Sequence, residues 1–401
     1  MLSAQSTPVV RATLPAVGAN LGAITELFYR RLFEEHPALL HNLFNRANQA
    51  NGVQSQALAG AFAAFATALV ERPDERPDAL LSRIAHKHAS LGITPAQYTI
   101  VARHLLGAVK KVLGDAATPP VAAAWDEVYW LMANALIAME ARLYEQAAVA
   151  EGDVWLKLEI AERQQQSAHA VSFVLRRPDG LPLPLFRPGQ YVSVRVQLPD
   201  GARQIRQYSL STAPAEKSWR ITVKRERSAD GSLPHGEVSS WLHAHARAGD
   251  IIDVSLPFGD LALPMEETPI VLASAGIGVT PMLSMLDHLA VDTSARRIMV
   301  MHADRSPADH AHRHEQIGLV GRLENASLHL WYESGSTEAA GPEATKGRLN
   351  LEQLAVPAHA TAYLCGPLPF MRAARGELLL KGVSASAIHY EVFGPDLWLS
   401  K

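Results

Sequence analysis

The chain has 401 residues, of which 48% are hydrophobic and 19% are charged, and its formal net charge is -3 at pH 7. Because hydrophobic cores stop growing at roughly 250 to 300 residues, this length predicts two or three domains. The ordinary composition excludes a disordered chain, and the small negative charge excludes the basic surface typical of nucleic-acid binding.

A single cysteine, Cys365, leaves no pair for a disulfide or a cysteine zinc site within one chain, which fits a reducing compartment. The N-terminal segment lacks the basic start and apolar run of a signal peptide. The most apolar long window begins at Pro269 and is interrupted by glycines and prolines, so it falls short of a membrane-spanning helix. We therefore expect a cytoplasmic protein with no transmembrane segment, whose partners are small molecules and not nucleic acid.

The chain reads as three regions in succession. From about Leu14 to Tyr144, apolar residues recur with the helical period, and no strand-like alternation interrupts them. Short β-rich runs separated by Pro and Gly then extend from Trp155 to about Leu263, which predicts a small antiparallel barrel or sandwich. From Thr268 onward, apolar strands alternate with helices, which predicts a parallel sheet with crossover helices. The predicted domains are 1–146, 153–263 and 264–401.

The stretch "RIAHKHASLG" places two histidines on one helix of the first region. Helical spacing groups His88 with Leu81, Ile84 and Leu91 on an apolar stripe and puts His86 on a more polar one. We therefore expect His88 to point into the core and His86 to point away from it. A core histidine satisfied by a neighbouring carbonyl is the simpler interpretation of His88, and a ligand-binding histidine is the alternative.

Other helices of the first region carry polar side chains on apolar faces. Glu140 lies on such a face and needs a partner such as a histidine N–H, because burying it unpaired is costly or forces protonation. Tyr29 lies at the edge of a stripe, with its hydroxyl either in water or in a cavity. Gln54 is either a residue of a frayed first turn or a hydrogen-bond donor in a pocket. With His88 and Tyr98, these residues suggest a metal-bound imidazole held by a carboxylate, and a haem iron suits one histidine in an apolar helical pocket.

At these residues the first region resembles the globin of the flavohaemoglobins, in "FYRRLFEEHP", "LFNRANQANGVQSQALA", "HKHASLGITPAQY" and "ALIAMEARLY". The resemblance implies haem b, with His88 as its proximal iron ligand and with Glu140 and Tyr98 as the hydrogen-bond partners of that histidine. It also implies that Tyr29, Gln54 and Leu58 line the distal pocket and that Phe44 packs against the porphyrin.

The β-rich region contains "RQYSLST", in which Arg206, Tyr208 and Ser209 offer a cation, a flat ring and a hydroxyl. A flavin needs such groups for its phosphates and its isoalloxazine ring. The motif is weak alone, and it gains weight from "HGEVSSWL", where a helix start at Gly236 offers backbone N–H groups to a diphosphate. Tyr191 in "FRPGQYV" adds a further aromatic ring at a strand start.

The third region contains "SAGIGVTPM" after an apolar strand, where Gly276 and Gly278 allow a dinucleotide to approach the backbone. The pattern is G-x-G-x-T-P and differs from the fingerprint of ordinary dinucleotide-binding dehydrogenases, and a purely structural glycine turn is the alternative. A second strand-turn-helix places Cys365, Gly366 and Pro367 at the carboxyl edge of the same sheet, where ligands of open α/β sheets bind. A cysteine there is more often a buried small residue than a reactive one.

These motifs, in this order, resemble the ferredoxin-reductase-like module, whose last motif here is "YEVFG". The resemblance implies that FAD is bound by Tyr191, Arg206, Gln207, Tyr208, Ser209, Gly236, Glu237, Val238 and Ser239. It implies that NAD(P)H is bound by Gly276, Gly278, Thr280, Pro281, Cys365, Gly366 and Pro367, while Phe393 covers the flavin ring with Glu391 nearby.

The combined resemblance implies a multidomain fold of an all-α globin, an antiparallel β-barrel FAD domain and an α/β NAD(P)-binding domain. It implies a nitric oxide dioxygenase in which NAD(P)H reduces FAD, FAD reduces haem b, and the ferrous haem with bound O2 oxidises nitric oxide to nitrate. A hydroperoxide reductase, or an oxygen-storing or sensing globin with a maintenance reductase, is the alternative. A lipid is a further candidate ligand of the distal pocket, and we expect a monomer.

One segment departs from the expected pattern, because residues 302–314 hold four histidines. We interpret this segment as a solvated loop and helix start and not as a metal site, since no matching partner cluster is visible. It borders the nicotinamide region and leaves the preference between NADH and NADPH open.

Overall fold

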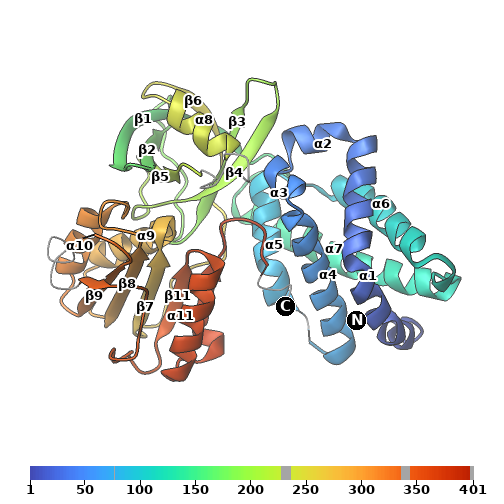
Figure 1. Ribbon diagram of the computed structural model, residues 1–401. Coiled ribbons are helices and arrows are strands. Elements are labelled where there is room, and N and C mark those ends of the chain that lie inside the picture. Colours follow the sequence, from blue (N-terminus) through green and yellow to red (C-terminus); the bar gives the residue numbers. More distant parts are fainter. Residues whose placement is uncertain (76, 227–235, 336–343, 398–401) are drawn as a thin grey trace. The chain divides into compact units, whose positions relative to one another are not determined.

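The computed structural model describes residues 1–75, 77–226, 236–335 and 344–397. Its chain contacts divide it into two compact units (Figure 1). The helical unit comprises Met1–Trp155, Arg195–Arg206 and Gly394–Lys401, and the sheet unit comprises Leu156–Val194 and Gln207–Phe393. The division keeps the second and third predicted domains together, so their separate boundaries stay a prediction.

The helical unit is built from long helices that bury one apolar face each. Its elements are α1 (Ser6–Glu35), α2 (Pro37–Asn42), α3 (Arg46–Ala50), α4 (Val53–Glu71), α5 (Asp78–Leu91), α6 (Pro95–Leu113), η1 (Gly114–Ala116) and α7 (Pro119–Gln146). Helix α1 packs against α4, α6 and α7, and α5 packs against α7. Helix α1 begins earlier than expected and includes Pro15, and the buried Val10 in its added turns supplies apolar contacts that offset the lost hydrogen bond.

The turn between α5 and α6 is tightly defined. Gly92 ends α5 with a φ of +74°, a conformation that glycine adopts without steric cost. Thr94 and Gln97 then form a capping box at the start of α6. From α7, the Tyr144 hydroxyl donates to the Ile93 carbonyl at 2.6 Å. These contacts fix where α5 ends and where α6 begins. The turn lies between His88 and Tyr98, two of the residues expected at the haem site.

Helix α4 is long and apolar enough to cross a membrane by length and composition, and among the described residues it is the one helix with this property. Phe62, Phe65 and Leu69 of α4 are nevertheless buried in the core of the helical unit. A core helix passes the same test, and α4 packs as one.

The first part of the sheet unit is a six-stranded sheet of order β4-β3-β6-β1-β2-β5. Its elements are β1 (Trp155–Ser167), β2 (Ala170–Arg176), β3 (Tyr191–Gln197), β4 (Arg203–Ser209), β5 (Trp219–Lys224), α8 (Glu237–His245) and β6 (Ile251–Ser255). A bridge between Leu210, which follows β4, and Ile221 in β5 joins the two end strands. The sheet therefore closes as a barrel and not as a sandwich.

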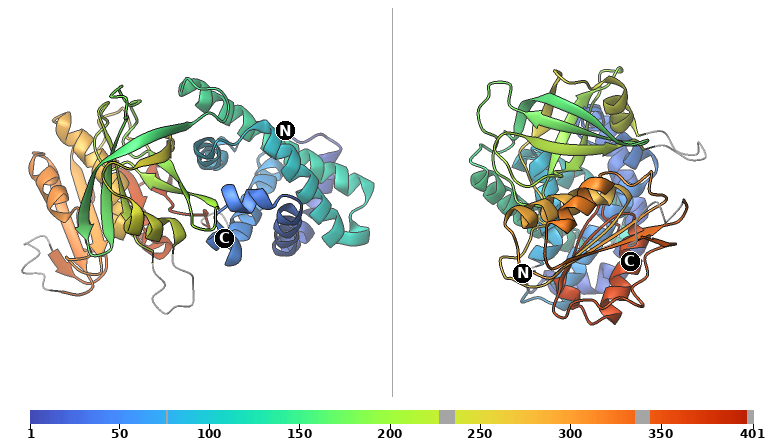
Figure 2. Two further views of the ribbon diagram at one scale, coloured as in Figure 1. Left: turned by 90° about the horizontal axis from the view of Figure 1, so that it is seen from above. Right: turned by 90° about the vertical axis from the view of Figure 1, so that its left-hand side faces the viewer.

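The second part of the sheet unit is a parallel sheet of order β10-β9-β8-β7-β11-β12, which is seen apart from the barrel strands in the right-hand view of Figure 2. Its elements are β7 (Ile270–Ala275), η2 (Gly276–Gly278), α9 (Val279–Val291), β8 (Ile298–Asp304), α10 (Arg313–Gly321), β9 (Ala326–Tyr332), β10 (Ala344–Lys346), β11 (Thr361–Cys365), α11 (Leu368–Leu380), η4 (Ala385–Ala387) and β12 (Ile388–Glu391). Ser274 pairs with His302 on one side and with Cys365 on the other. The carboxyl ends of β7, β8 and β11 therefore lie together at one edge.

Candidate functional site

The predicted group around His88 forms in the helical unit. The His88 Nδ1 atom lies 2.9 Å from both the Glu140 Oε1 and the Tyr98 hydroxyl, and that hydroxyl donates to the same Oε1 at 2.5 Å. Since a carboxylate can only accept, the imidazole donates its Nδ1–H and keeps a lone pair on Nε2. Burial, followed by the Glu140 charge, raises the pKa of Tyr98, so its hydroxyl stays a donor. His88 is thus held in the tautomer that binds a metal through Nε2.

The orientation expected for His86 is wrong, whereas His88 faces the buried Glu140 and Tyr98 as expected. His86 is buried, whereas the side chain of His88 is 32% exposed. The face of α5 that packs on other helices consists of Leu81, Ala85 and Ala89, each four residues from the next, so His88 lies at its edge. The apolar stripe predicted from Leu81, Ile84, His88 and Leu91 is wider than the packed face of α5, so it did not show that His88 lies at the edge of that face. The edge position leaves the His88 imidazole accessible to a ligand.

Tyr29 is buried among aromatic rings, so the interpretation that leaves its hydroxyl in water is wrong. Its ring centroid lies 5.7 Å from that of Phe33 and 5.8 Å from that of Phe44. Burial raises the pKa of Tyr29 above its ordinary range, and hydrogen bonding by the side chains of Gln54 and Gln49 offsets this only in part. The hydroxyl therefore remains protonated and can donate to a ligand.

Gln49 is a residue that sequence reasoning missed. Its Nε2 atom is buried beside the Tyr29 hydroxyl and has no other partner among the described residues. Gln49 lies on the five-residue helix α3, whose N-cap Asn45 accepts from two backbone N–H groups. A helix this short shows no periodicity that marks one face, and only the fold brings Gln49 to Tyr29. Leu58 is partly buried against the same core.

Several of the residues predicted to bind the flavin lie on or beside the barrel strands. The Ser209 Oγ is buried and has no hydrogen-bond partner among the described residues. Such an atom is costly unless a ligand or water satisfies it. Tyr191 is buried, and a Cβ at Gly259 would stand 3.2 Å from its ring. Gln207 donates to the Ser193 hydroxyl at 3.0 Å, and Tyr208 is half-buried.

Gly236 and Arg206, both predicted to bind the flavin, have hydrogen-bond partners within the protein. The backbone N–H of Gly236 donates to the Glu226 carbonyl at 3.0 Å and is not the group that faces outward. Helix α8 begins at Glu237 after the N-cap residue Gly236, and the positive end of its helix dipole favours an anion there. Arg206 belongs to the helical unit, where its Nη2 lies 2.9 Å from the Asn45 Oδ1.

The two glycine motifs of the parallel sheet meet at its carboxyl edge. A Cβ at Gly278 would overlap the Cys365 carbonyl, so only glycine fits there. Gly276 has a φ of +54° and open space on its Cβ side. Gly366 has a φ of +157°. A hollow at this edge is lined by Gly276, Asp304 and Arg305 together with Lys224 of the barrel.

The remaining residues predicted for this edge differ in exposure. Cys365 is fully buried, and burial raises its pKa well above the ordinary thiol value, so the interpretation as a buried small residue is confirmed. Glu391 is buried beside it in the ladder of β11 and β12. Phe393 is 47% exposed. Thr280 and Pro281 are buried in the first turn of α9.

Family models match the three parts of the chain in order: Globin at residues 26–136, Oxidoreductase FAD-binding domain at 157–262 and Oxidoreductase NAD-binding domain at 272–376. The chain is 42% identical to the flavohemoprotein of Rhizobium meliloti (strain 1021), over 99% of this chain and 100% of that protein. It is also 42% identical to the flavohemoprotein of Chromobacterium violaceum, over 98% of each. The chain belongs to the flavohemoprotein family.

Solved structures agree with this assignment. The flavohemoglobin of Malassezia yamatoensis with bound FAD and heme superposes with a TM-score of 0.88 at 37% identity, covering 98% of this chain and 100% of that chain. The FAD/NAD binding domain of the nitric oxide dioxygenase of Vibrio cholerae matches with a TM-score of 0.55 at 36% identity, covering 60% of this chain and 98% of that one. The predicted fold and the cofactors haem, FAD and a nicotinamide dinucleotide are confirmed.

The residues present in this flavohemoprotein fit those groups. The imidazole lone pair of His88 suits a haem iron, and the unsatisfied Ser209 hydroxyl suits a flavin. The start of α8 and the open turn at Gly276 suit phosphate-bearing ligands.

The solvated interpretation of residues 302–314 is wrong, because three of their four histidines are buried and only His314 is exposed. His302 and His310 stack with ring centroids 3.8 Å apart. The His302 Nδ1 pairs with the Ser274 hydroxyl, and the His310 Nδ1 pairs with the Tyr332 hydroxyl, each at 2.9 Å. These partners come from neighbouring strands, and so composition alone could not reveal them.

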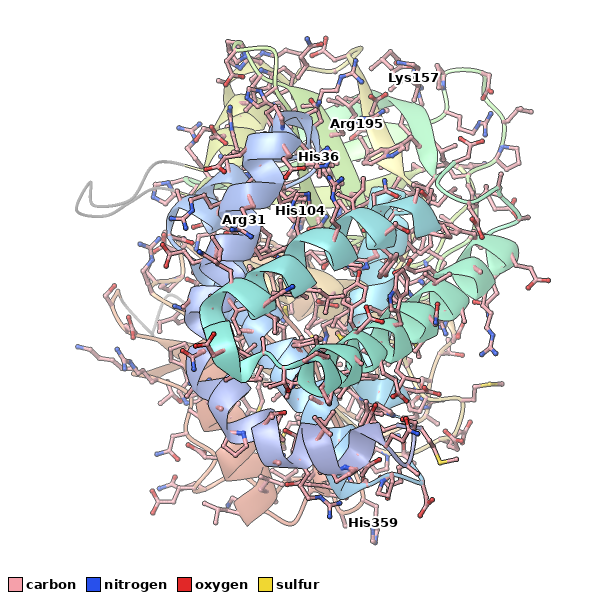
Figure 3. All side chains as sticks on the ribbon, turned by 90° about the vertical axis from the view of Figure 1, so that its right-hand side faces the viewer. Arg31, His36, His104, Lys157, Arg195 and His359 are labelled. Atoms are coloured by element: carbon pink, nitrogen blue, oxygen red, sulfur yellow. The ribbon has the colours of Figure 1, made fainter. Side chains whose placement is uncertain are left out.

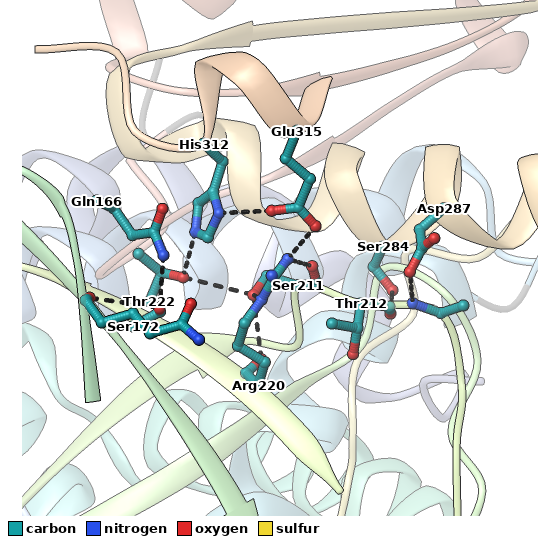
Figure 4. A network of polar contacts seen from close by, with 12 residues as sticks. Gln166, Ser172, Ser211, Thr212, Arg220, Thr222, Ser284, Asp287, His312 and Glu315 are labelled. Atoms are coloured by element: carbon teal, nitrogen blue, oxygen red, sulfur yellow. Dashed lines mark hydrogen bonds and ion pairs between the residues drawn. The ribbon is translucent and has the colours of Figure 1, made fainter. Parts of the chain in front are cut away.

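His312 connects this segment to the barrel within the sheet unit (Figure 4). Its Nε2 lies 2.8 Å from the Thr222 hydroxyl, and its Nδ1 lies 2.8 Å from Glu315. Glu315 also accepts from Arg220 of β5 at 2.7 Å. Asp287 accepts from the backbone N–H of Ala213 at 2.7 Å. The segment is therefore a polar joint between α10 and the barrel.

Proposed function

We propose that this flavohemoprotein is a nitric oxide dioxygenase, which combines nitric oxide, O2 and one electron from NAD(P)H into nitrate. The observation that carries the proposal is the buried Tyr29 hydroxyl beside the amides of Gln54 and Gln49. When bound, the haem supplies the iron at which gases bind, and FAD and NAD(P)H supply the electrons that keep it reduced.

Tyr29 would act as a hydrogen-bond donor to an oxygen atom that gains negative charge. A neutral hydroxyl in a buried pocket does this without reorganising water, because it is already oriented and desolvated. The raised pKa of Tyr29 keeps the proton on its oxygen. Gln54 would orient that hydroxyl, while Phe44 and Leu58, which pack against the core, would exclude water.

His88 would hold the iron, with Glu140 and Tyr98 as positioning residues. Their oxygens fix the Nδ1–H and with it the direction of the Nε2 lone pair. A carboxylate that accepts this proton makes the imidazole a stronger electron donor, which favours the transfer of negative charge toward a bound gas.

The sheet unit would deliver the electrons. We propose that Ser209, Tyr191, Arg206, Gln207 and Tyr208 hold FAD. The N–H groups of Glu237, Val238 and Ser239, with Gly236 before them, would bind its diphosphate. The nicotinamide dinucleotide would lie over Gly276, Gly278, Thr280, Pro281, Cys365, Gly366 and Pro367, with Phe393 and Glu391 near the flavin.

The test starts from haem- and FAD-loaded protein reduced with NADH or NADPH without oxygen. Oxygen and nitric oxide are then added together, while nitrate, NAD(P)H and the haem Soret band are followed. Tyr29→Phe is expected to slow nitrate formation roughly 100- to 1000-fold, the usual effect of removing one such donor. Tyr144→Phe is the matched control, since its buried hydroxyl serves only the Ile93 carbonyl.

The same experiment separates the rival functions. Reduced protein that binds oxygen reversibly but leaves nitric oxide to its uncatalysed reaction would contradict the proposal and favour storage or sensing. Faster NAD(P)H consumption with an organic hydroperoxide than with nitric oxide would favour the hydroperoxide reductase. A lipid in the distal pocket, the monomeric state and the cytoplasmic location stay predictions.

A further inference from the structure

The C-terminal end of α1 and the middle of α6 bring three metal-ligating side chains together. Glu35, His36 and His104 each offer one ligand atom, and these atoms lie within 4.8 Å of one another. The His104 Nε2 is 3.8 Å from the Glu35 Oε2, and the two imidazole rings are perpendicular with centroids 5.5 Å apart. Figure 3 labels both histidines, with Arg31 close by. In the described ranges this is the one group of three that meets this distance.

A cationic nitrogen already touches all three ligand atoms. The Arg103 Nη2 lies 2.8 Å from the Glu35 Oε2 and 3.3 Å from the Nε2 of both His36 and His104. A guanidinium has donors and no acceptor, so each imidazole presents its Nε2 lone pair toward that nitrogen. Lone pairs on two imidazoles and a carboxylate oxygen are the ligands that Zn²⁺ prefers.

The surroundings of the three ligand atoms carry charges of both signs. Glu35 lies in the last turn of α1, at the negative end of that helix dipole, whereas α2 begins after His36 and the cations Arg31 and Arg103 lie near His104. The side chain of His104 is only 3% exposed, so its ring is held in place by packing.

We propose that Glu35, His36 and His104 form a binding site for Zn²⁺, with Arg103 as a displaceable cation that occupies it when no metal is bound. The ligand atoms of a tetrahedral zinc site are about 3.4 Å apart, given Zn–ligand distances of about 2.0–2.2 Å. Glu35 is 57% exposed and Arg103 is 63% exposed, so one can move inward and the other outward. An open hollow gives access from solvent, and it is lined by Arg31, Glu34, Glu35, Arg103 and His104.

The site leaves the fourth zinc position to water, as three-ligand zinc sites do. A bound zinc ion would crosslink the end of α1 to α6. Tyr29 lies on α1 less than two turns before this end. The inference does not depend on the proposed reaction, and binding can be measured without turnover.

The experiment uses full-length protein loaded with haem and FAD and freed of other metals by a chelator. Zn²⁺ affinity is measured by competition with a chromophoric chelator, and Co²⁺ absorption reports the coordination geometry. His36→Ala and Glu35→Gln are expected to weaken binding roughly tenfold or more. Arg103→Ala is expected to tighten it roughly tenfold, since displacing a charge-assisted hydrogen bond costs about that factor.

His41→Ala, which removes an exposed histidine of α2, is the matched control and should bind Zn²⁺ like the parent protein. The haem Soret band of every variant confirms that the helical unit is folded. Equal affinity in the parent and in His36→Ala would overturn the site. Unchanged or weaker binding in Arg103→Ala would overturn the role of the arginine as the displaced cation.

Discussion

The joint between α10 and the barrel makes the stability of the sheet unit depend on pH. Glu315 accepts hydrogen bonds from His312 and Arg220, whose side chains are almost wholly buried. Burial alone would raise the pKa of Glu315, but these two partners outweigh it and lower the pKa from 4.5 to about 2. A carboxyl group with a lowered folded-state pKa stabilises the fold above pH 4.5, and this contribution is lost as pH falls toward 2.

His312 acts in the same direction. Burial lowers its pKa below the ordinary 6.5, although Glu315 opposes this. The unfolded chain therefore takes up the proton more readily than the folded one, and stability falls as pH drops below 6.5. Acid should thus weaken this joint in two steps, first through His312 and then through Glu315.

The magnitude follows from the two pKa values of Glu315. The difference between 4.5 and about 2 corresponds to about 3 kcal/mol. Since 31% of the Glu315 side chain is exposed, solvent screening reduces this to about 2 kcal/mol. Glu315→Gln is therefore expected to lower the free energy of unfolding by about 2 kcal/mol at pH 7, with a difference from the parent that shrinks as pH approaches 3.

The assay is urea unfolding of the FAD-loaded protein between pH 7 and pH 3, followed by flavin fluorescence on release. Glu162→Gln, which changes an exposed carboxylate on β1, is the control and should unfold like the parent. If the parent and Glu315→Gln lost stability in parallel over this pH range, the low pKa of Glu315 would not be a source of folding stability, and the reasoning would be refuted.

Three further predictions concern the cofactor sites. Glu140→Gln should speed the loss of haem to an acceptor protein roughly 10- to 100-fold, because the carboxylate orients the iron ligand; an unchanged rate would contradict that role. Gly278→Ala should destabilise the sheet unit by about 1–3 kcal/mol in thermal unfolding and weaken NAD(P)H binding, since its Cβ would overlap the Cys365 carbonyl. Cys365 should resist alkylation at pH 8 until urea unfolds the chain, because it is fully buried with a raised pKa, and rapid labelling of the native protein would disprove this burial.

Much of the fold was predictable because the three regions differ in period. Helical spacing identified α1, α4 and α7, alternation and turn residues identified the barrel, and apolar strands followed by helices identified the parallel sheet. The helical region was expected to begin near Leu14, whereas α1 begins at Ser6 and continues through Pro15, because the packing of Val10 stabilises the added turns. Local pattern thus gave element type well and element ends less well.

The candidate site was predictable where a buried polar side chain requires a hydrogen-bond partner. A carboxylate on the apolar face of α7 required a donor, and His88, 52 residues earlier in the chain, meets that demand at 2.9 Å. The side of α5 that His86 faces was not predictable, because Ala85 and Ala89 decide the packed face and small residues carry little weight in an apolar stripe. Periodicity therefore identified the helix and misassigned its faces.

The hydrogen-bond partners of other buried polar groups could not be predicted from the sequence. His302 and His310 each pair Nδ1 with a hydroxyl of the parallel sheet, while the Nε2 atoms of both rings are buried and have no hydrogen-bond partner among the described residues. The Ser209 Oγ is likewise buried with no hydrogen-bond partner among the described residues, and the buried Gln49 Nε2 lies beside Tyr29. Folded proteins rarely leave such atoms unpaired. Ser209 lies in the motif expected to hold the flavin, and Gln49 adjoins Tyr29, so we propose that a bound flavin and a bound gas would supply hydrogen-bond partners at these two positions.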